Sequence, residues 1–363
     1  MLAPQAFSNL GYESVVFPST TIKHSGSRQI QIGGVSIRIS AERHSDLIFG
    51  SMLERFSRDS VVCDLDLRVQ WVEKLPNTRG LKLFDCGVLW SVFELDEVLQ
   101  FDFCTATLGP LPYKRLLIDR QLRFATILMS IDAFARCDRH ADPMEYPLDE
   151  LLLTHRLTRE HAIEIHSTGI VRTNGDANLF VGHSGAGKST TTRLWTDVED
   201  VEVLSDDRII VRRDEGRPAA QIPGDDPASA SKHEVLRLRD CSASPTNLSA
   251  QDDKQIPRFA RNDKKMRMYG TPWHGEAMFA SPNSAPLTRI FVLEHGHGNV
   301  ITPLSPSQAV AELFARSFVP FHRHEYVDSA LVFLEELANS VPVYRYSFEP
   351  DQRAVDRIRQ FRD

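Results

Sequence analysis

The sequence predicts an α/β chain of the α+β kind, with a β-rich N-terminal domain followed by a domain built on a mixed sheet. Apolar and polar residues alternate in short runs between residues 25 and 130, which is typical of strands with one solvent-facing side. Leucines at helical spacing follow from Leu148, and strand-like and helix-like segments then succeed one another. We therefore expect two domains, residues 1–145 and 146–363.

The composition is that of an ordinary globular protein. Of the 363 residues, 42% are hydrophobic and 25% are charged, and the net charge of −7 argues against a nucleic-acid-binding surface. The five cysteines form no C-x-x-C pair, which favours free thiols over a disulfide framework or a zinc site. We find neither a signal-peptide pattern nor an apolar run long enough to span a membrane, so we expect a cytoplasmic protein that does not bind a membrane.

The strands of the first domain are predicted from alternation and turn residues. Runs 29–32 and 35–39 flank Gly33-Gly34, the pattern of a hairpin with a two-residue turn. Further strands are expected at 67–71, 88–95, 98–105, 115–118 and 123–129. Because polar residues alternate along them, we expect antiparallel sheets with one wet face.

The second domain is expected to begin with a helix whose first turn contains Pro147. A strand over 162–171 and a tight turn at Asn174-Gly175 then lead into a strand at 178–181. Later elements are predicted as strands at 201–204, 209–211, 287–293 and 343–348 and helices at 190–196, 307–317, 328–340 and 351–362. The polar stretch 240–265 is expected to be a poorly ordered insertion.

Residues 182–189, Gly-His-Ser-Gly-Ala-Gly-Lys-Ser, match the phosphate-binding pattern G-x-x-x-x-G-K-[ST]. Glycines let the backbone curl so that successive N–H groups face phosphate oxygens, and the helix that follows directs its positive end at them. Lys188 brings a charge to the β- and γ-phosphates, and Ser189 offers a hydroxyl to Mg²⁺. The motif predicts binding of ATP and Mg²⁺ by Gly182, Ser184, Gly185, Ala186, Gly187, Lys188, Ser189 and Thr190.

The acid pair Asp206-Asp207 follows Lys188 by only 18 positions, beside strand-like residues. Adjacent residues of a strand point to opposite faces, so one acid can orient Mg²⁺ while the other approaches the phosphoryl acceptor. Most phosphate-loop enzymes carry the metal-orienting Asp much further along the chain. The short spacing and the antiparallel strand leading into the loop therefore exclude most of these families.

The order His166, then the loop 182–189, then Asp206-Asp207 resembles the HPr kinase/phosphorylase family and its wider relatives, whose fold is related to phosphoenolpyruvate carboxykinases. The resemblance covers about residues 147–350. It implies a serine kinase in which Asp206 is the base toward the acceptor serine and His166 lies near it, with Lys188 on the phosphates. It also implies that Ser189 and Asp207 lie near the metal, and that the chain forms a homo-oligomer.

The segment 269–276, Tyr-Gly-Thr-Pro-Trp-His-Gly-Glu, is similar to a motif of the wider HPr-kinase-like group. We expect it to be a loop that returns to the active site, where Glu276 can contact the metal. The Gly- and Asn-containing signature of true HPr kinases is missing from the sequence. We therefore do not expect this chain to recognise HPr itself. The histidines in 295–297 and 322–325 lack metal-binding spacing and are interpreted as structural.

Three functions fit these observations. The first is an ATP-dependent kinase that phosphorylates a serine of a protein or peptide. The second keeps the carboxykinase-related fold but phosphorylates a small molecule. The third is a non-catalytic, nucleotide-gated binding protein, which the intact Asp206-Asp207 pair argues against because a sensor can lose its base.

Overall fold

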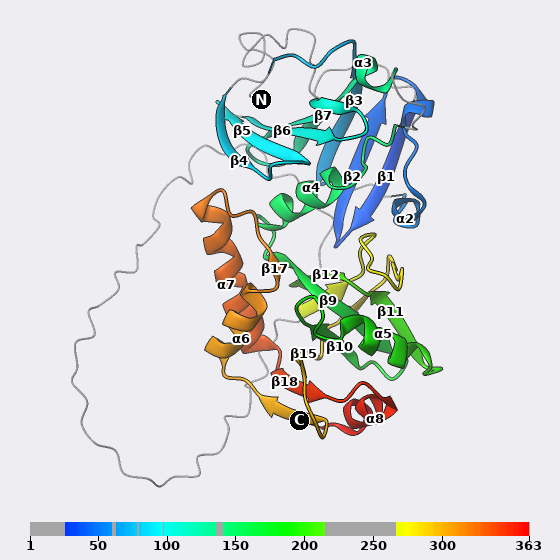
Figure 1. Cartoon of the computed structure of the whole chain (residues 1–363), viewed down its shortest axis with the longest axis vertical. Helices are drawn as coiled ribbons and strands as arrows, with labels where there is room; N and C mark the ends of the chain where they lie inside the picture. Colours follow the sequence, from blue (N-terminus) through cyan, green and yellow to red (C-terminus); the bar gives the residue numbers. More distant parts are fainter. Residues whose placement is uncertain are drawn as a thin grey trace, which may run out of the picture.

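The computed structural model describes residues 26–59, 63–77, 80–96, 98–135, 141–214 and 266–362, arranged as a mixed α/β chain with two mixed sheets. The predicted insertion at 240–265 lies outside these residues. Figure 1 shows the eight-stranded sheet at one end of the molecule and the ten-stranded sheet at the other, with one helix between them. Within the described ranges, no helix is both long and apolar enough to cross a membrane.

The first sheet has the strand order β1-β2-β3-β8-β7-β6-β5-β4. Its strands are β1 (Gly26–Ile32), β2 (Val35–Ala41), β3 (Leu65–Val72), β4 (Leu81–Asp85), β5 (Trp90–Leu95), β6 (Val98–Thr105), β7 (Gly109–Asp119) and β8 (Phe124–Ser130). Short helical turns accompany them: η1 (His44–Asp46), α2 (Ser51–Glu54) and α3 (Ile131–Phe134). The predicted hairpin is confirmed, because β1 pairs with β2 around Gly33 and Gly34, whose φ angles are 57° and 78°.

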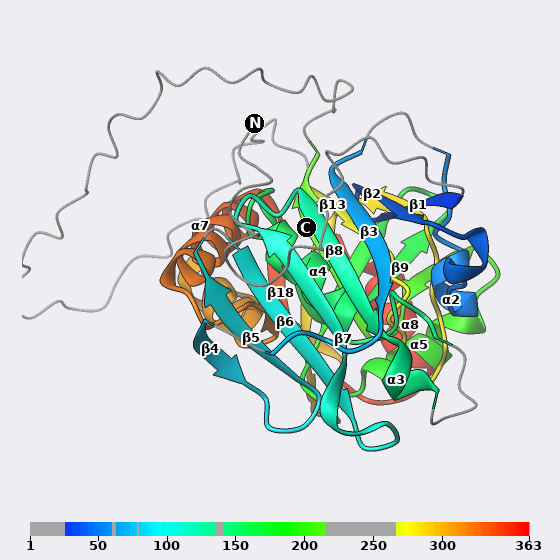
Figure 2. The same ribbon diagram turned by 90° about the horizontal axis from the view of Figure 1, so that it is seen from above.

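The expectation of antiparallel sheets with one wet face is met only in part in this domain, where five of the seven strand pairs are antiparallel. Strand β3 runs parallel to both β2 and β8, which makes the sheet mixed. Seen from above in Figure 2, these strands lie side by side. Strands β6, β7 and β8 are buried along most of their length, so both faces of the sheet centre are covered. Alternation predicts a strand, but it does not give the direction of the neighbouring strand.

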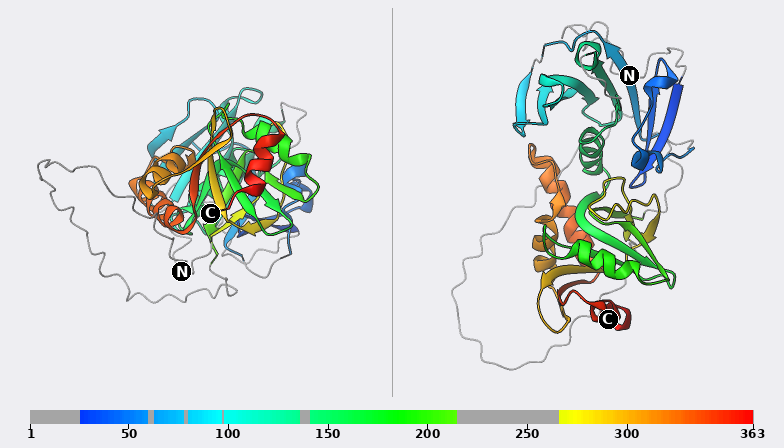
Figure 3. Two further views of the ribbon diagram at one scale, coloured as in Figure 1. Left: turned by 90° about the horizontal axis from the view of Figure 1, so that it is seen from below. Right: turned by 45° about the vertical axis from the view of Figure 1, so that its right-hand side comes forward.

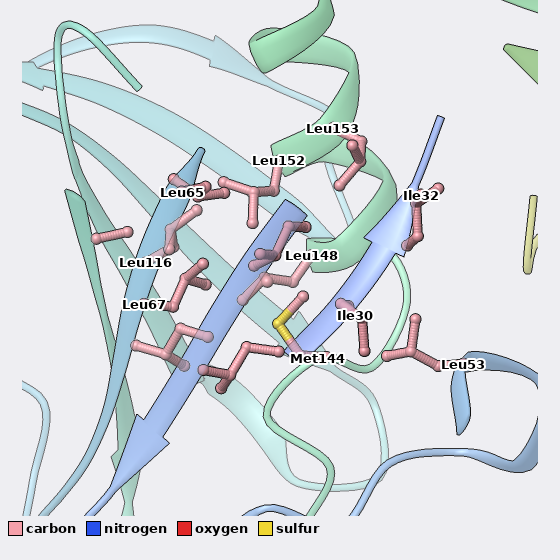
Figure 4. Packing of buried hydrophobic residues seen from close by; sticks show 14 of the residues in the cluster. Ile30, Ile32, Leu53, Leu65, Leu67, Leu116, Met144, Leu148, Leu152 and Leu153 are labelled. Atoms are coloured by element: carbon pink, nitrogen blue, oxygen red, sulfur yellow. The ribbon is translucent and has the colours of Figure 1, made fainter. Parts of the chain in front are cut away.

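Helix α4 (Leu148–Leu157) connects the two sheets, as Figures 1 and 3 show. Its leucines point into the core of the first sheet, where Leu148, Leu152 and Leu153 meet residues of β1, β3 and β7 (Figure 4). Ile210 and Trp273, from the second half of the chain, belong to the same buried cluster. The core of the first sheet therefore extends past residue 145, the expected domain boundary.

The second sheet has the order β14-β13-β12-β9-β10-β15-β18-β16, with β11 and β17 also paired to β9. Its strands are β9 (Ala162–Arg172), β10 (Ala177–Val181), β11 (Val201–Ser205), β12 (Arg208–Arg213), β13 (Met266–Tyr269), β14 (Ser284–Pro286), β15 (Arg289–His295), β16 (Val300–Pro303), β17 (Ser317–Phe318) and β18 (Val343–Phe348). Helices α5 (Lys188–Thr196), α6 (Pro306–Phe314), α7 (His324–Ser340) and α8 (Gln352–Gln360) flank it.

The helices cover both faces of this sheet. Helices α6 and α7 contribute to one buried cluster, and α5 and α8 to the other (Figure 3). Strand β9 is antiparallel to β10 through the predicted Asn174-Gly175 turn, while β10, β15 and β18 are parallel. Ligands of such sheets bind at the carboxyl ends of the parallel strands, and the end of β10 is where residues 182–189 begin.

Candidate active site

The loop 182–189 has the backbone that its glycines predict. Gly185 and Gly187 have φ angles of 82° and 99°, in the left-handed region that other residues avoid. At Gly182, a Cβ atom would come within 2.8 Å of the Ala186 Cβ, so a larger residue would open the curl. Gly187 caps α5, and its carbonyl oxygen accepts the Thr191 N–H at 2.8 Å.

Lys188 lies inside this curl. Its Nζ donates to the carbonyl oxygens of Gly182 at 3.1 Å and His183 at 3.3 Å, and the residue is 7% exposed. Burial lowers the pKa of Lys188, while the negative charge of Asp207 acts in the opposite direction. A partly desolvated ammonium within a ring of backbone groups is a strong partner for an anion.

Strand β9 brings the acid pair to this loop. Its first half pairs with β12 and its second half with β10 and β11, so the turn between β11 and β12 lies beside the end of β10. Thr168 of β9 contacts both α5, the helix after the loop, and the acid pair. Its Oγ1 lies 3.2 Å from the Thr192 hydroxyl and 3.2 Å from the Asp206 carbonyl oxygen. The close spacing of Lys188 and Asp206 in sequence therefore corresponds to closeness in the fold.

Asp206 is buried, with 1% of its surface exposed. Its carboxylate accepts the backbone N–H groups of Gly275 at 3.0 Å, Ala277 at 2.9 Å and Phe279 at 3.1 Å. The role of base expected for Asp206 does not fit this geometry, because a base must reach an acceptor that arrives from solvent. Asp206 instead fixes the segment 275–279 against the β11–β12 turn.

The side chain of Asp207 points away from that of Asp206 and is half-buried. Its Oδ1 lies 2.9 Å from Nε2 of His166, and its Oδ2 accepts a hydrogen bond from Arg208. Burial alone raises the pKa of Asp207, but the His166 hydrogen bond and the Arg208 charge outweigh it and hold the pKa below its ordinary value. Asp207 is therefore an ionised carboxylate near Lys188 at neutral pH.

Arg208 is surrounded by acids that the sequence did not single out. Its Nε donates to Glu150 of α4 and lies 3.4 Å from Oε1 of Glu164 on β9. Its guanidinium lies over the Phe318 ring at 4.6 Å, and the His166 ring contacts the same phenyl group. A sequence signal existed for Glu164, because it is a charged residue within an otherwise apolar strand. Burial, followed by the charge of Glu150, raises its pKa well above the ordinary value.

The segment 269–276 returns to the site, as expected. Thr271 donates to the Arg208 carbonyl oxygen at 2.7 Å, and Ser205 donates to the Trp273 carbonyl oxygen at 3.2 Å. The Trp273 indole N–H donates to Asp149 at 2.8 Å, whose pKa burial raises to about 7. These bonds tie the segment to both α4 and the β11–β12 turn.

Glu276 does not join the other acids. Its side chain is 86% exposed and lies 4.0 Å from Arg193 of α5. Among the described residues, no three His, Cys, Asp or Glu side chains converge on a common point for a metal. Of the remaining expected ligands, Asp207 is already bonded to His166 and to the Arg208 cation, so Ser189 is the one that suits Mg²⁺ bound mainly through phosphate oxygens and water.

Histidines also make contacts outside this acid cluster. The buried His155 contacts the half-buried His322, with ring centroids 5.1 Å apart, between α4 and the start of α7. His295 ends β15, and its Nε2 lies 2.7 Å from the Gly185 carbonyl oxygen. No sequence pattern links His295 to residues 182–189, since the contact spans 110 positions and depends on β15 lying parallel to β10.

Comparison with protein-family models found no match to this chain, and no curated protein matches it either.

Proposed function

We propose that this protein is an ATP- and Mg²⁺-dependent kinase of the HPr serine kinase-like type, with a phosphoenolpyruvate carboxykinase-like phosphate-loop fold. Its phosphoryl acceptor is a serine hydroxyl of a protein or peptide. The observation that carries the proposal is the placement of Asp207 beside the loop that holds the buried Lys188: the His166 carbonyl oxygen accepts the Gly182 N–H at 3.4 Å, and the His166 Nε2 lies 2.9 Å from Asp207. One group suits the phosphoryl donor, and the other suits the hydroxyl that receives it.

The loop residues bind the phosphoryl donor, ATP. Gly182, Gly185 and Gly187 allow the curl, while Ser184, Ala186, Ser189 and Thr190 line it or begin α5. Lys188 would exchange its two carbonyl partners for phosphate oxygens, which recovers the solvation that burial removes from the ammonium. Mg²⁺, when bound, would neutralise phosphate charge, with Ser189 as the protein group that fits it.

Asp207, rather than Asp206, is the carboxylate that acts on the serine hydroxyl of the phosphoryl acceptor. In the reaction, the serine oxygen forms a bond to the γ-phosphorus as the bond to the β–γ bridging oxygen breaks, and ADP leaves. The hydroxyl proton passes to Asp207, which His166 and Arg208 hold in position. The low pKa of Asp207 suits a loose transition state, in which the carboxylate orients the hydroxyl and takes the proton late.

The test is phosphoryl transfer from γ-labelled ATP with Mg²⁺ to a library of serine peptides. The wild type should label serine peptides, and replacement of serine by alanine in a labelled peptide should abolish the signal. Label in small metabolites but in no peptide would favour the small-molecule kinase. Binding of ATP without transfer to any acceptor would favour the non-catalytic binding protein.

A further inference from the structure

The loop 182–189 is held from outside by His295. Its Nε2 lies 2.7 Å from the Gly185 carbonyl oxygen, and because a carbonyl oxygen only accepts, Nε2 carries the proton and donates it. His295 is the last residue of β15, the parallel neighbour of β10. The two strands therefore bring the loop and the histidine to the same edge of the sheet.

This hydrogen bond sets the direction of one peptide group in the loop. In a trans peptide, the carbonyl oxygen and the following N–H point to opposite sides. With the Gly185 carbonyl turned toward His295, the Ala186 N–H points into the curl, where it donates to the His183 carbonyl oxygen at 3.0 Å. Gly185 has no side chain to restrain this peptide, which is held by His183 within the loop and by His295 outside it.

His295 is itself fixed by Phe348, its partner in the pairing of β15 with β18. The two rings stack with centroids 6.0 Å apart and planes at 26°. Phe348 also lies under Gly187, where a Cβ atom would come within 2.4 Å of its Cζ. The second half of the loop therefore rests on two adjacent rings.

We propose that His295 is a positioning residue for the nucleotide: its bond to Gly185, together with the Ala186 bond to His183, holds the 185–186 peptide and keeps the loop in the shape that surrounds the phosphates. This inference rests on the proposed nucleotide binding. His297 provides a matched control two residues further on, because its side chain is fully exposed and lies 3.6 Å from Glu349.

The test is titration with a non-hydrolysable ATP analogue and Mg²⁺ of the wild type, H295F, H295Q and H297A. Phenylalanine keeps a ring on Phe348 but lacks the donor, whereas glutamine restores an N–H donor. We expect H295F to bind about tenfold more weakly, the effect of one hydrogen bond, with H295Q and H297A within about threefold of the wild type. A purely structural role would lower thermal stability without separating H295F from H295Q.

Wild-type affinity in H295F, or equally weak binding by H295F and H295Q, would overturn the inference. If the wild type binds no analogue at all, the proposed function fails, and hydrogen exchange without nucleotide then decides the role of His295. Exchange across residues 183–188 should be faster in H295F than in H295Q and the wild type. Equal exchange in all three proteins would overturn the inference independently.

Discussion

Nε2 of His166 lies 2.9 Å from Oδ1 of Asp207, joining β9 to the turn between β11 and β12. The neighbouring acid, Asp206, faces away from this contact and is enclosed by backbone N–H groups of 275–279. Two adjacent carboxylates thus have different surroundings: Asp207 bonds to His166 and Arg208, and Asp206 holds a loop.

Asp207→Asn should lower the rate of phosphoryl transfer by about 10²–10⁴-fold, the usual contribution of a positioned acid or base. Nucleotide affinity should change much less, because the loop and Lys188 remain. Parallel measurement of kcat and of the nucleotide Kd checks this. A loss of nucleotide affinity as large as the loss of rate would show that Asp207 acts on the phosphoryl donor instead of on the acceptor hydroxyl.

Asp206→Ala should destabilise the fold by about 2–4 kcal/mol, because three N–H groups lose their buried acceptor. Denaturant unfolding measures the change. Glu276→Gln is the control in the same segment, and its exposed side chain should leave stability within about 0.5 kcal/mol. An Asp206→Ala protein as stable as the control would show that the three bonds contribute nothing.

Gly187→Ala should disturb the loop more than Gly185→Ala. Both positions have positive φ, which costs a residue with a Cβ about 1–2 kcal/mol. A Cβ at position 187 would also meet Phe348 at 2.4 Å, whereas nothing lies within 4 Å of one at position 185. Thermal unfolding of the two variants makes the comparison, and an equal loss of stability would contradict the packing of Phe348 against the loop.

His155 should make stability sensitive to acid. Burial lowers its pKa to about 3 from the 6.5 of an exposed histidine, so protons bind the unfolded chain more tightly. Its contribution is present above pH 6.5 and is lost as the pH falls toward 3. Relative to His155→Gln, the wild type should lose about 2 kcal/mol between pH 7 and pH 5.

The difference between the two proteins is the quantity to measure, because Asp149 titrates in the opposite direction. The pKa of Asp149 is raised to about 7, so its contribution is fully present below pH 3.8 and is lost as the pH rises through 7. It cancels in the comparison of the wild type with His155→Gln. A stability difference that does not vary between pH 7 and pH 5 would rule out a neutral, buried His155.

The sequence predicted the local features of this molecule better than the long-range ones. Glycines at 33–34 and 175 marked hairpins because only their backbone fits such turns, and the strand preceding residues 182–189 was located correctly. The parallel pairing of β3 was missed, since side-chain alternation is the same in either direction. The ends of α6 and α7 also differ by a few residues from those expected.

For the candidate site, the sequence identified the loop and the acid pair, but it did not show which contacts each of the two acids makes. Alternation along a strand predicts that Asp206 and Asp207 diverge, yet it does not reveal which one meets the loop 275–279. Glu150 and His295 reach the site from α4 and β15, and only the packing of those elements brings them there. Their positions depend on tertiary contacts that no local pattern records.

The most direct measurement of the central claim is equilibrium binding of Mg²⁺ and ATP to the wild type and to Lys188→Ala. We predict that the wild type binds and that the variant binds about 10- to 100-fold more weakly, because a hydrogen bond to a charged group contributes about 1.5–3 kcal/mol. Thermal stability without nucleotide should be similar in the two proteins. Equal affinity of both proteins for ATP, or no binding by the wild type, would contradict a nucleotide site at residues 182–189.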